Sequence, residues 1–171
     1  VQHGSEKILK DMRRGLGPDG IRRRISDLRG QNSNIAIRTS IIVGFPGETN
    51  NDFLNTYNFL NELEISYLHV FTYSERPDTD AVEMGEVVSK EKRAERSRML
   101  HILSGKKRRF FHDQFVNQRR PVLFENMKNG KLLGHTDNYI QIQTDGTPDL
   151  INTIHPVKLS GNYGRFVQGI F

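Results

Sequence analysis

The spacing of apolar residues changes near residue 118, and this change divides the chain into two kinds of structure. Before it, apolar runs of strand length alternate with runs at helical spacing, as in a parallel α/β sheet or part of a barrel. After it, short β-like runs follow one another, separated by turn signals such as Asn129-Gly130. Closely spaced short strands are typical of a small β-barrel. We therefore predict an α/β domain at 1–117 and an antiparallel β-barrel at 118–171.

The individual elements are expected from local signals. Ser5 and Pro18 are suited to begin helices, and Thr49 or Asn50 begins another. The apolar run at 35–43 predicts a strand that is buried on both faces. The other predicted strands lie at 67–73, 121–125, 131–136, 139–143, 155–159 and 166–170. A long helix expected at 89–115 has an apolar side formed by Leu100, Leu103, Phe110, Phe111 and Phe115.

Charge is unevenly distributed, although the net charge of the whole chain is only +5. The segment 48–86 contains nine acidic residues and one arginine, whereas 90–109 contains nine basic and two acidic residues. A basic segment can attract phosphates, or it can simply be a solvated helix face. The chain has no cysteine, so it cannot hold a disulfide or a thiolate-bound cluster. No apolar run is long enough for a transmembrane helix, and we expect no membrane partner.

The sharpest local signal is the run Ile-Val-Gly-Phe-Pro-Gly-Glu-Thr at 42–49, directly after an apolar strand. Active sites of parallel α/β proteins gather at the carboxyl ends of strands. Gly44 and Gly47 allow a ligand to approach the backbone, and Pro46 stiffens the loop. Glu48 could hold a polar group or cap the next helix. The run indicates a binding loop, and the alternative is an ordinary strand-to-helix turn.

Two further strand ends carry polar side chains. Gln2, His3 and Ser5 could bond ribose hydroxyls, although Ser5 is also explained as a helix N-cap. In the strand at 67–73, apolar residues could face an adenine ring, and His69 is expected to be a core histidine. The histidines show no metal-binding spacing, and the P-loop, dinucleotide and serine-hydrolase motifs are absent.

In order along nearly the whole chain, these segments resemble the radical S-adenosylmethionine (SAM) methylthiotransferases of the MiaB and MtaB type. The run at 42–49 matches a motif of that family without a mismatch. Residues 2–14 look like its Gln-Ser-Gly-Ser and Leu-x-x-Met-x-Arg stretch, and 68–77 look like the strand that leads into its Tyr-Ser-x-Arg loop. The tail fits the layout of the TRAM domain, a small RNA-binding β-barrel, at 124–125, 134–139 and 164–169.

The resemblance implies a fold and an activity. The α/β part would be the C-terminal portion of a radical SAM partial (β/α) barrel in a longer cytoplasmic enzyme. That enzyme would be a tRNA methylthiotransferase, which adds a 2-methylthio group to a hypermodified adenosine next to the anticodon, with threonylcarbamoyl-adenosine favoured. Its cofactors would be SAM and two 4Fe-4S clusters, reduced by an electron donor protein. Because the cluster cysteines would lie upstream, this chain is expected to be inactive alone, and its open sheet edge favours self-association.

Residues of two sites are predicted. By position in the family, the residues near SAM would be Gln2, Ser5, Arg38, Ser40, Val43, Gly44, Phe45, Pro46, Gly47, Phe71 and Tyr73. The partner would be tRNA, and the residues predicted to bind it are Lys106, Lys107, Arg108, Arg109, Arg119 and Arg120. No catalytic residue and no metal ligand are expected among the 171 residues.

Two other functions remain open at this level. Ser40 stands where the tRNA-modifying members often have aspartate, and Arg38-Thr39 resembles the sister enzyme that thiomethylates an aspartate of a ribosomal protein. The alternative to both enzymes is a non-catalytic RNA-binding module made of the basic helix and the barrel. The run at 135–139 resembles the tRNA-modifying branch.

Overall fold

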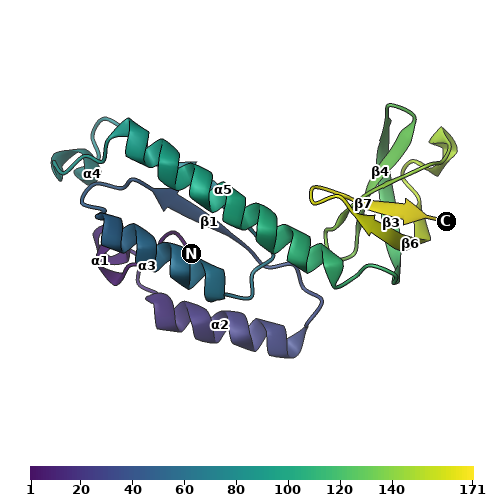
Figure 1. Ribbon diagram of the computed structural model, residues 1–171, viewed down its shortest axis with the longest axis horizontal. Coiled ribbons are helices and arrows are strands. Elements are labelled where there is room, and N and C mark those ends of the chain that lie inside the picture. The colour runs from purple at the N-terminus through teal and green to yellow at the C-terminus, as the bar shows by residue number, and fades with distance from the viewer. The chain divides into compact units, whose positions relative to one another are not determined.

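The computed structural model describes residues 1–171, which form two compact units, Val1–Ser104 and Gly105–Phe171. The first unit is α/β, and the second contains a closed five-stranded β-barrel (Figure 1). The predicted succession of an α/β part and a small β-barrel is therefore confirmed. The helices are α1 (Glu6–Asp11), α2 (Pro18–Gln31), α3 (Asn50–Glu62), α4 (Asp80–Glu83), α5 (Lys90–Asp113) and the 3-10 turn η1 (Pro148–Leu150). None of them is long and apolar enough to cross a membrane.

The sheet of the first unit has two parallel strands, β1 (Arg38–Val43) and β2 (Tyr67–Thr72), joined through α3. Their register places Arg38 opposite Tyr67 and Val43 opposite Thr72. One face of the sheet is covered by a hydrophobic core that draws side chains from α2, α3 and α5. This arrangement leaves the carboxyl ends of both strands together, where ligands bind in open α/β sheets.

Strand β1 is buried on one face only, so the prediction of burial on both faces is wrong. Thr39, Ile41 and Val43 point into the core, whereas Ser40 is exposed and Ile42 is half-buried. The apolar run at 35–43 has the composition of a doubly buried strand, but only one layer of helices covers it. The uncovered face is therefore available to line a site.

Helix α3 begins where the sequence indicates, because Thr49 forms a capping box with Asp52. The Thr49 hydroxyl accepts from the Asp52 amide at 3.1 Å, and the Asp52 carboxylate accepts from the Thr49 amide at 3.0 Å. These two bonds satisfy backbone donors that a helix leaves free at its first turn. The cap thereby fixes the direction in which the chain leaves the loop after β1.

Helix α5 buries less of its apolar side than its spacing predicts, and more of its charge. Leu100, Leu103, Phe111 and Phe115 are buried as expected, but Phe110 is 70% exposed, so its expected burial is wrong. Arg93 and Arg96, by contrast, are about 95% buried. The basic segment 90–109 is therefore not one solvated face, since two of its guanidinium groups bind inside the first unit.

The barrel strands are β3 (Arg119–Lys128), β4 (Lys131–Thr136), β5 (Gln141–Thr144), β6 (Ile154–Asn162) and β7 (Val167–Ile170). They close in the order β3-β4-β5-β7-β6, and their interior is filled by buried side chains such as Phe124 and Ile142. The barrel is not wholly antiparallel as predicted, because β5 and β7 pair in parallel through Ile142 with Val167 and Gln143 with Gln168. The η1 turn and strand β6 intervene between them, so both can run in the same direction.

The last turns of α5 fold with the barrel. Phe111 and Phe115 are buried, and the Asn162 amide of β6 donates to the Arg109 carbonyl at 2.9 Å and to the Asp113 carboxylate at 2.7 Å. Asn117 donates its backbone amide to the Leu159 carbonyl at 2.7 Å. These bonds fix the end of the helix against strand β6 of the barrel.

His112 makes the stability of this second unit depend on pH. Burial, together with the positive charge of Arg108, lowers the pKa of His112 to about 4. The unfolded chain has the ordinary pKa of about 6.5, so it binds the proton first as the pH falls. We expect stability to be complete above pH ~6.5 and to decline toward pH ~4, with a slope of up to about 1.4 kcal/mol per pH unit. Urea unfolding across this range checks the prediction, and His112→Gln should remove this part of the slope.

Candidate functional site

A cavity of about 700 Å³ lies at the carboxyl ends of β1 and β2. Its walls come from both strands, the loop after each strand and the first turns of the chain. The lining residues are Gln2, Met12, Arg14, Ser40, Ile42, Phe45, Phe71, Thr72, Tyr73, Ser74, Arg76, Thr79 and Ala81. Its size lies within the range of small-molecule sites.

Aromatic rings and free polar groups meet in this cavity. The Phe71 side chain is 55% exposed, and the rings of Phe45 and Tyr73 pack edge to face at 5.5 Å. The Tyr73 hydroxyl is buried and has no hydrogen-bond partner. Because a buried hydroxyl without a partner costs free energy, it marks a place where a ligand acceptor would be stabilised. Gln2 is held in place by a 2.6 Å bond from the Arg14 guanidinium to its side-chain oxygen.

The loop at 44–47 turns sharply because both of its glycines adopt left-handed backbone conformations. The φ angles of Gly44 and Gly47 are each +76°. A Cβ at Gly44 would lie 2.4 Å from the Arg93 side chain, so glycine is required there for packing as well as for conformation. The carbonyl of Gly47 accepts from Lys7 Nζ at 2.9 Å, and its amide donates to the Glu86 carbonyl at 2.9 Å.

A buried polar cluster of His3, Glu48 and Arg96 holds this loop in place. Glu48 accepts the backbone amide of Gly44 through one carboxylate oxygen, while its other oxygen lies 3.3 Å from Arg96 Nη1. His3 Nδ1 accepts from the Ser5 amide at 3.1 Å, which leaves the ring proton on Nε2, 3.7 Å from the same carboxylate. All three side chains are at least 95% buried. Glu48 therefore neither caps α3 nor lines the cavity, but joins the loop to α5.

Arg93 anchors the loop after β2 to α5 in a similar way. It donates to the Tyr73 carbonyl at 2.9 Å and to the Glu75 carboxylate, and its guanidinium lies 5.3 Å from the Tyr73 ring centre. The hydrogen bond from Arg93 lowers the pKa of Glu75 to about 2. Both loops at the mouth of the cavity are thus anchored to arginines of α5.

The structure brings together five of the residues predicted near SAM and separates the others from the cavity. Gln2, Ser40, Phe45, Phe71 and Tyr73 line it. The remaining six do not, for reasons that differ. Ser5 Oγ donates to Asp52 at 2.7 Å. Arg38 begins β1 and donates to the Tyr67 hydroxyl, and Val43 is in the core. Gly44, Pro46 and Gly47 belong to the same loop as Phe45 but do not line the cavity.

Two arginines that line the cavity were not among the residues predicted near SAM, and one histidine lies elsewhere than predicted. Arg14 and Arg76 line the cavity, and both stand in stretches whose family resemblance was visible. His69 was expected in the core, but it is exposed on the open face of β2 beside the Tyr67 ring, 5.3 Å away. The resemblance of a stretch was therefore a better guide to the cavity than the polarity of single residues.

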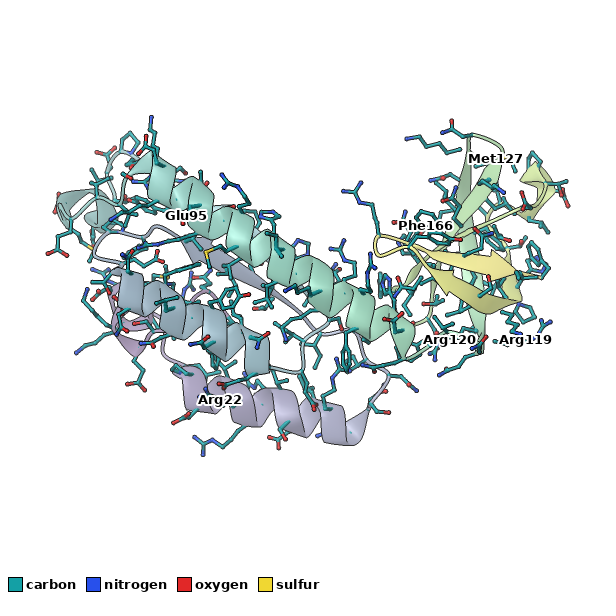
Figure 2. All side chains as sticks on the ribbon, in the orientation of Figure 1. Arg22, Glu95, Arg119, Arg120, Met127 and Phe166 are labelled. Carbon is teal, nitrogen blue, oxygen red and sulfur yellow. The ribbon has the colours of Figure 1, made fainter.

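The basic residues predicted to bind RNA lie in the second unit and differ in exposure. Lys106, Arg109 and Arg119 are exposed, whereas Lys107 is half-buried and burial lowers its pKa. Arg120, beside Arg119 at the start of β3 (Figure 2), donates hydrogen bonds from Nε and Nη2 to the two carboxylate oxygens of Asp137, at 2.9 and 2.8 Å. Such a bidentate pair leaves little of the Arg120 charge for a phosphate.

Comparison with known proteins finds relatives over nearly the whole chain. The chain is 35% identical over 98% of its length to the threonylcarbamoyladenosine tRNA methylthiotransferase MtaB of Bacillus subtilis (strain 168), and covers 40% of that protein. It is 35% identical over 99% of its length to the tRNA-2-methylthio-N(6)-dimethylallyladenosine synthase of Ehrlichia chaffeensis, again covering 40%. The corresponding synthase of Syntrophotalea carbinolica is 34% identical over 95% of the chain, which covers 38% of it.

No family model matches the sequence. The chain spans about two fifths of the length of the curated relatives that it matches. These relatives agree with the resemblance seen in the motifs at 2–14, 42–49 and 68–77, and nearly the whole chain is homologous to part of the tRNA methylthiotransferases of the MtaB and MiaB type.

Proposed function

We propose that the chain is part of a tRNA methylthiotransferase that adds the 2-methylthio group to threonylcarbamoyl-adenosine next to the anticodon. The observation that carries the proposal is the 35% identity to the Bacillus subtilis enzyme of that name over 98% of the chain. The cavity at the ends of β1 and β2 supports it, because it lies where α/β enzymes bind their ligands. The α/β unit would be the C-terminal portion of a radical SAM partial barrel.

The cavity would bind SAM, and its residues fit the chemical groups of this cofactor. Phe71 offers an exposed ring for the adenine, and the unpartnered Tyr73 hydroxyl offers a donor. Gln2 and Ser40 add amide and hydroxyl groups that suit ribose hydroxyls and the methionine end. When bound and reduced, SAM supplies the radical and the methyl group of the reaction. The residues of this chain bind and orient the cofactor and shield one side of it.

The 4Fe-4S clusters of such an enzyme would be held by residues outside these 171. The chain has no cysteine, and no group of three histidine or carboxylate side chains could hold a metal. Because iron–sulfur clusters are ligated by cysteine thiolates, the chain alone would be inactive. The same reasoning assigns the catalytic centre to a different part of the protein, with this chain supplying one wall of the SAM site.

The barrel would be the TRAM domain, which binds tRNA. Exposed Lys106, Arg109 and Arg119 supply positive charge in the same compact unit as the barrel. Charge of this kind attracts phosphates without reading sequence. The barrel would therefore hold the tRNA.

Nucleoside analysis of tRNA tests the function directly. Deleting the full gene should remove the 2-methylthio group from threonylcarbamoyl-adenosine and leave other methylthio-adenosines unchanged, as read by mass spectrometry. Returning the gene with Phe71→Ala should restore the modification poorly, since the variant removes the exposed ring of the cavity. The matched control is Leu54→Ala, a 50% exposed side chain of α3 outside the cavity, which should restore it fully. If every methylthio group persists in the deletion strain, the tRNA assignment is wrong.

A further inference from the structure

The outer face of three neighbouring barrel strands carries an apolar end and a basic end. Burial alternates along β3 and β6, so that Leu123 and Arg119 of β3 point outward, as do their partners on β6. Leu123 pairs with Ile154 of β6 on one side and with His135 of β4 on the other. Arg119 pairs with Lys158 of β6. The two ends are four residue positions apart along extended strand, which is about 13 Å.

At the apolar end, these residues form a hollow of about 340 Å³. Leu123 and Ile154 are 41% and 66% exposed, which is high for apolar side chains lining a concave surface. The ring of Tyr139, which is 71% exposed, stands at the edge of the hollow with its centre 6.3 Å from the His135 ring. An exposed aromatic ring beside an apolar floor is the arrangement on which nucleic-acid bases stack.

Tyr139 is held there at a conformational cost. Its φ angle is +62°, a left-handed conformation that residues with a bulky side chain rarely adopt. The turn that imposes it is closed by bonds from Tyr139 N to the Thr136 carbonyl and from Ile140 N to the Thr136 hydroxyl, both at 3.0 Å. Glycine or asparagine would fit this position with less strain. A strained, exposed tyrosine in a hydrogen-bonded turn points to a role outside folding.

The basic end is a cross-strand pair of like charges. Arg119 and Lys158 are directly opposite and both exposed, and no ion pair engages either of them. Such a pair opposes folding of the barrel unless an anion binds between the two side chains. A phosphate is the anion that suits this spacing of an arginine and a lysine on one face.

The acidic groups near the hollow decide which part of a nucleotide would sit there. Glu125 pairs with His135 at 2.9 Å, and Asp137 pairs with Arg120. Carboxylates at the rim repel a phosphate but can accept from the amino groups of a base. We propose that this face binds single-stranded RNA, with an unpaired base stacked on Tyr139 and the backbone phosphate bound by Arg119 and Lys158. The proposal rests on the proposed tRNA function and gives it a base-binding residue.

Binding of a fluorescent single-stranded RNA oligonucleotide to the 171-residue chain tests the proposal by anisotropy. Tyr139→Gly should weaken binding about 5- to 150-fold, the range for loss of one stacked base. Its melting temperature should stay the same or rise, because the left-handed conformation suits glycine. Tyr139→Phe should keep the affinity. Replacing Arg119 and Lys158 with alanine should lower the slope of log K against log salt by about 0.7 for each lost phosphate contact.

The matched control is Asn129→Gly, which relieves another left-handed residue, with φ +51°, in the β3–β4 turn, and should leave RNA affinity unchanged. Unchanged affinity in Tyr139→Gly overturns the base-binding role, and equal binding of an abasic oligonucleotide overturns it too. Absence of any RNA binding by the parent chain overturns the RNA assignment of this face. These outcomes are independent of the tRNA nucleoside analysis. That analysis can support the methylthiotransferase function even if Tyr139→Gly leaves RNA affinity unchanged.

Discussion

Replacing Arg96 with alanine is expected to lower the free energy of unfolding of the α/β unit by about 3–5 kcal/mol. The side chains of Arg96 and Glu48 are 5% and 0% exposed, and Arg96 also donates to the Asn50 side chain at 2.8 Å. Without the guanidinium, the Glu48 carboxylate stays buried with only the Gly44 amide and His3 near it. A buried charge that loses its partner costs far more than an exposed pair contributes.

Urea unfolding followed by circular dichroism measures this effect, and two variants control it. Arg98→Ala removes an exposed arginine two residues away on the same helix, and should change stability by less than about 0.5 kcal/mol. The double variant Arg96→Met with Glu48→Gln should recover much of the loss, because neither side chain then carries a charge. A loss below about 1 kcal/mol in Arg96→Ala would mean that water reaches Glu48 and that the cluster does not support the loop.

The same cluster shows what the sequence could and could not predict about the site. The run at 42–49 indicated a binding loop, and its glycines do turn the chain at the end of β1. Glu48 was expected to hold a polar group or cap α3, but Thr49 and Asp52 form the cap. The partner of Glu48 is 48 residues away, on a helix whose charges suggested either a phosphate-binding or a solvated face. Local periodicity shows that a residue is charged and where it lies on its helix, but not which charge is buried opposite it.

The fold was predictable to the extent that local signals decide it. Each predicted barrel strand exists within a few residues, because turn residues such as Asn129-Gly130 fix where the chain reverses. The errors concern what covers a surface. Phe110 has core spacing but is exposed, and the open face of β1 has the composition of a buried strand. The parallel pairing of β5 with β7 was also missed, since pairing between distant strands leaves no local mark.

Gly134→Ala is expected to destabilise the second unit by about 3 kcal/mol, because β4 has no room for a side chain at this position. A Cβ at this position would lie 2.2 Å from the carbonyl oxygen of Leu123 and 3.0 Å from the Cα of Phe124. Both are backbone atoms of the paired strand, beside the irregularity between Phe124 and Asn126, so no side-chain rotation can relieve the contact. The β3–β4 pair would have to separate, and the buried Phe124 ring would lose its packing.

Amide hydrogen exchange locates this loss, because it reports the two units separately. Exchange of the Ile142 and Val157 amides in the barrel should accelerate, whereas exchange of Ile41 in β1 should not change. Gly105→Ala provides a control of opposite sign, since nothing lies within 4 Å of a Cβ at this helical position and alanine favours a helix by about 1 kcal/mol. Equal stability of Gly134→Ala and the parent would show that β4 can move away from β3 without cost. The hollow beside His135 would then be a flexible surface, and the strain at Tyr139 would have no rigid strand to maintain it.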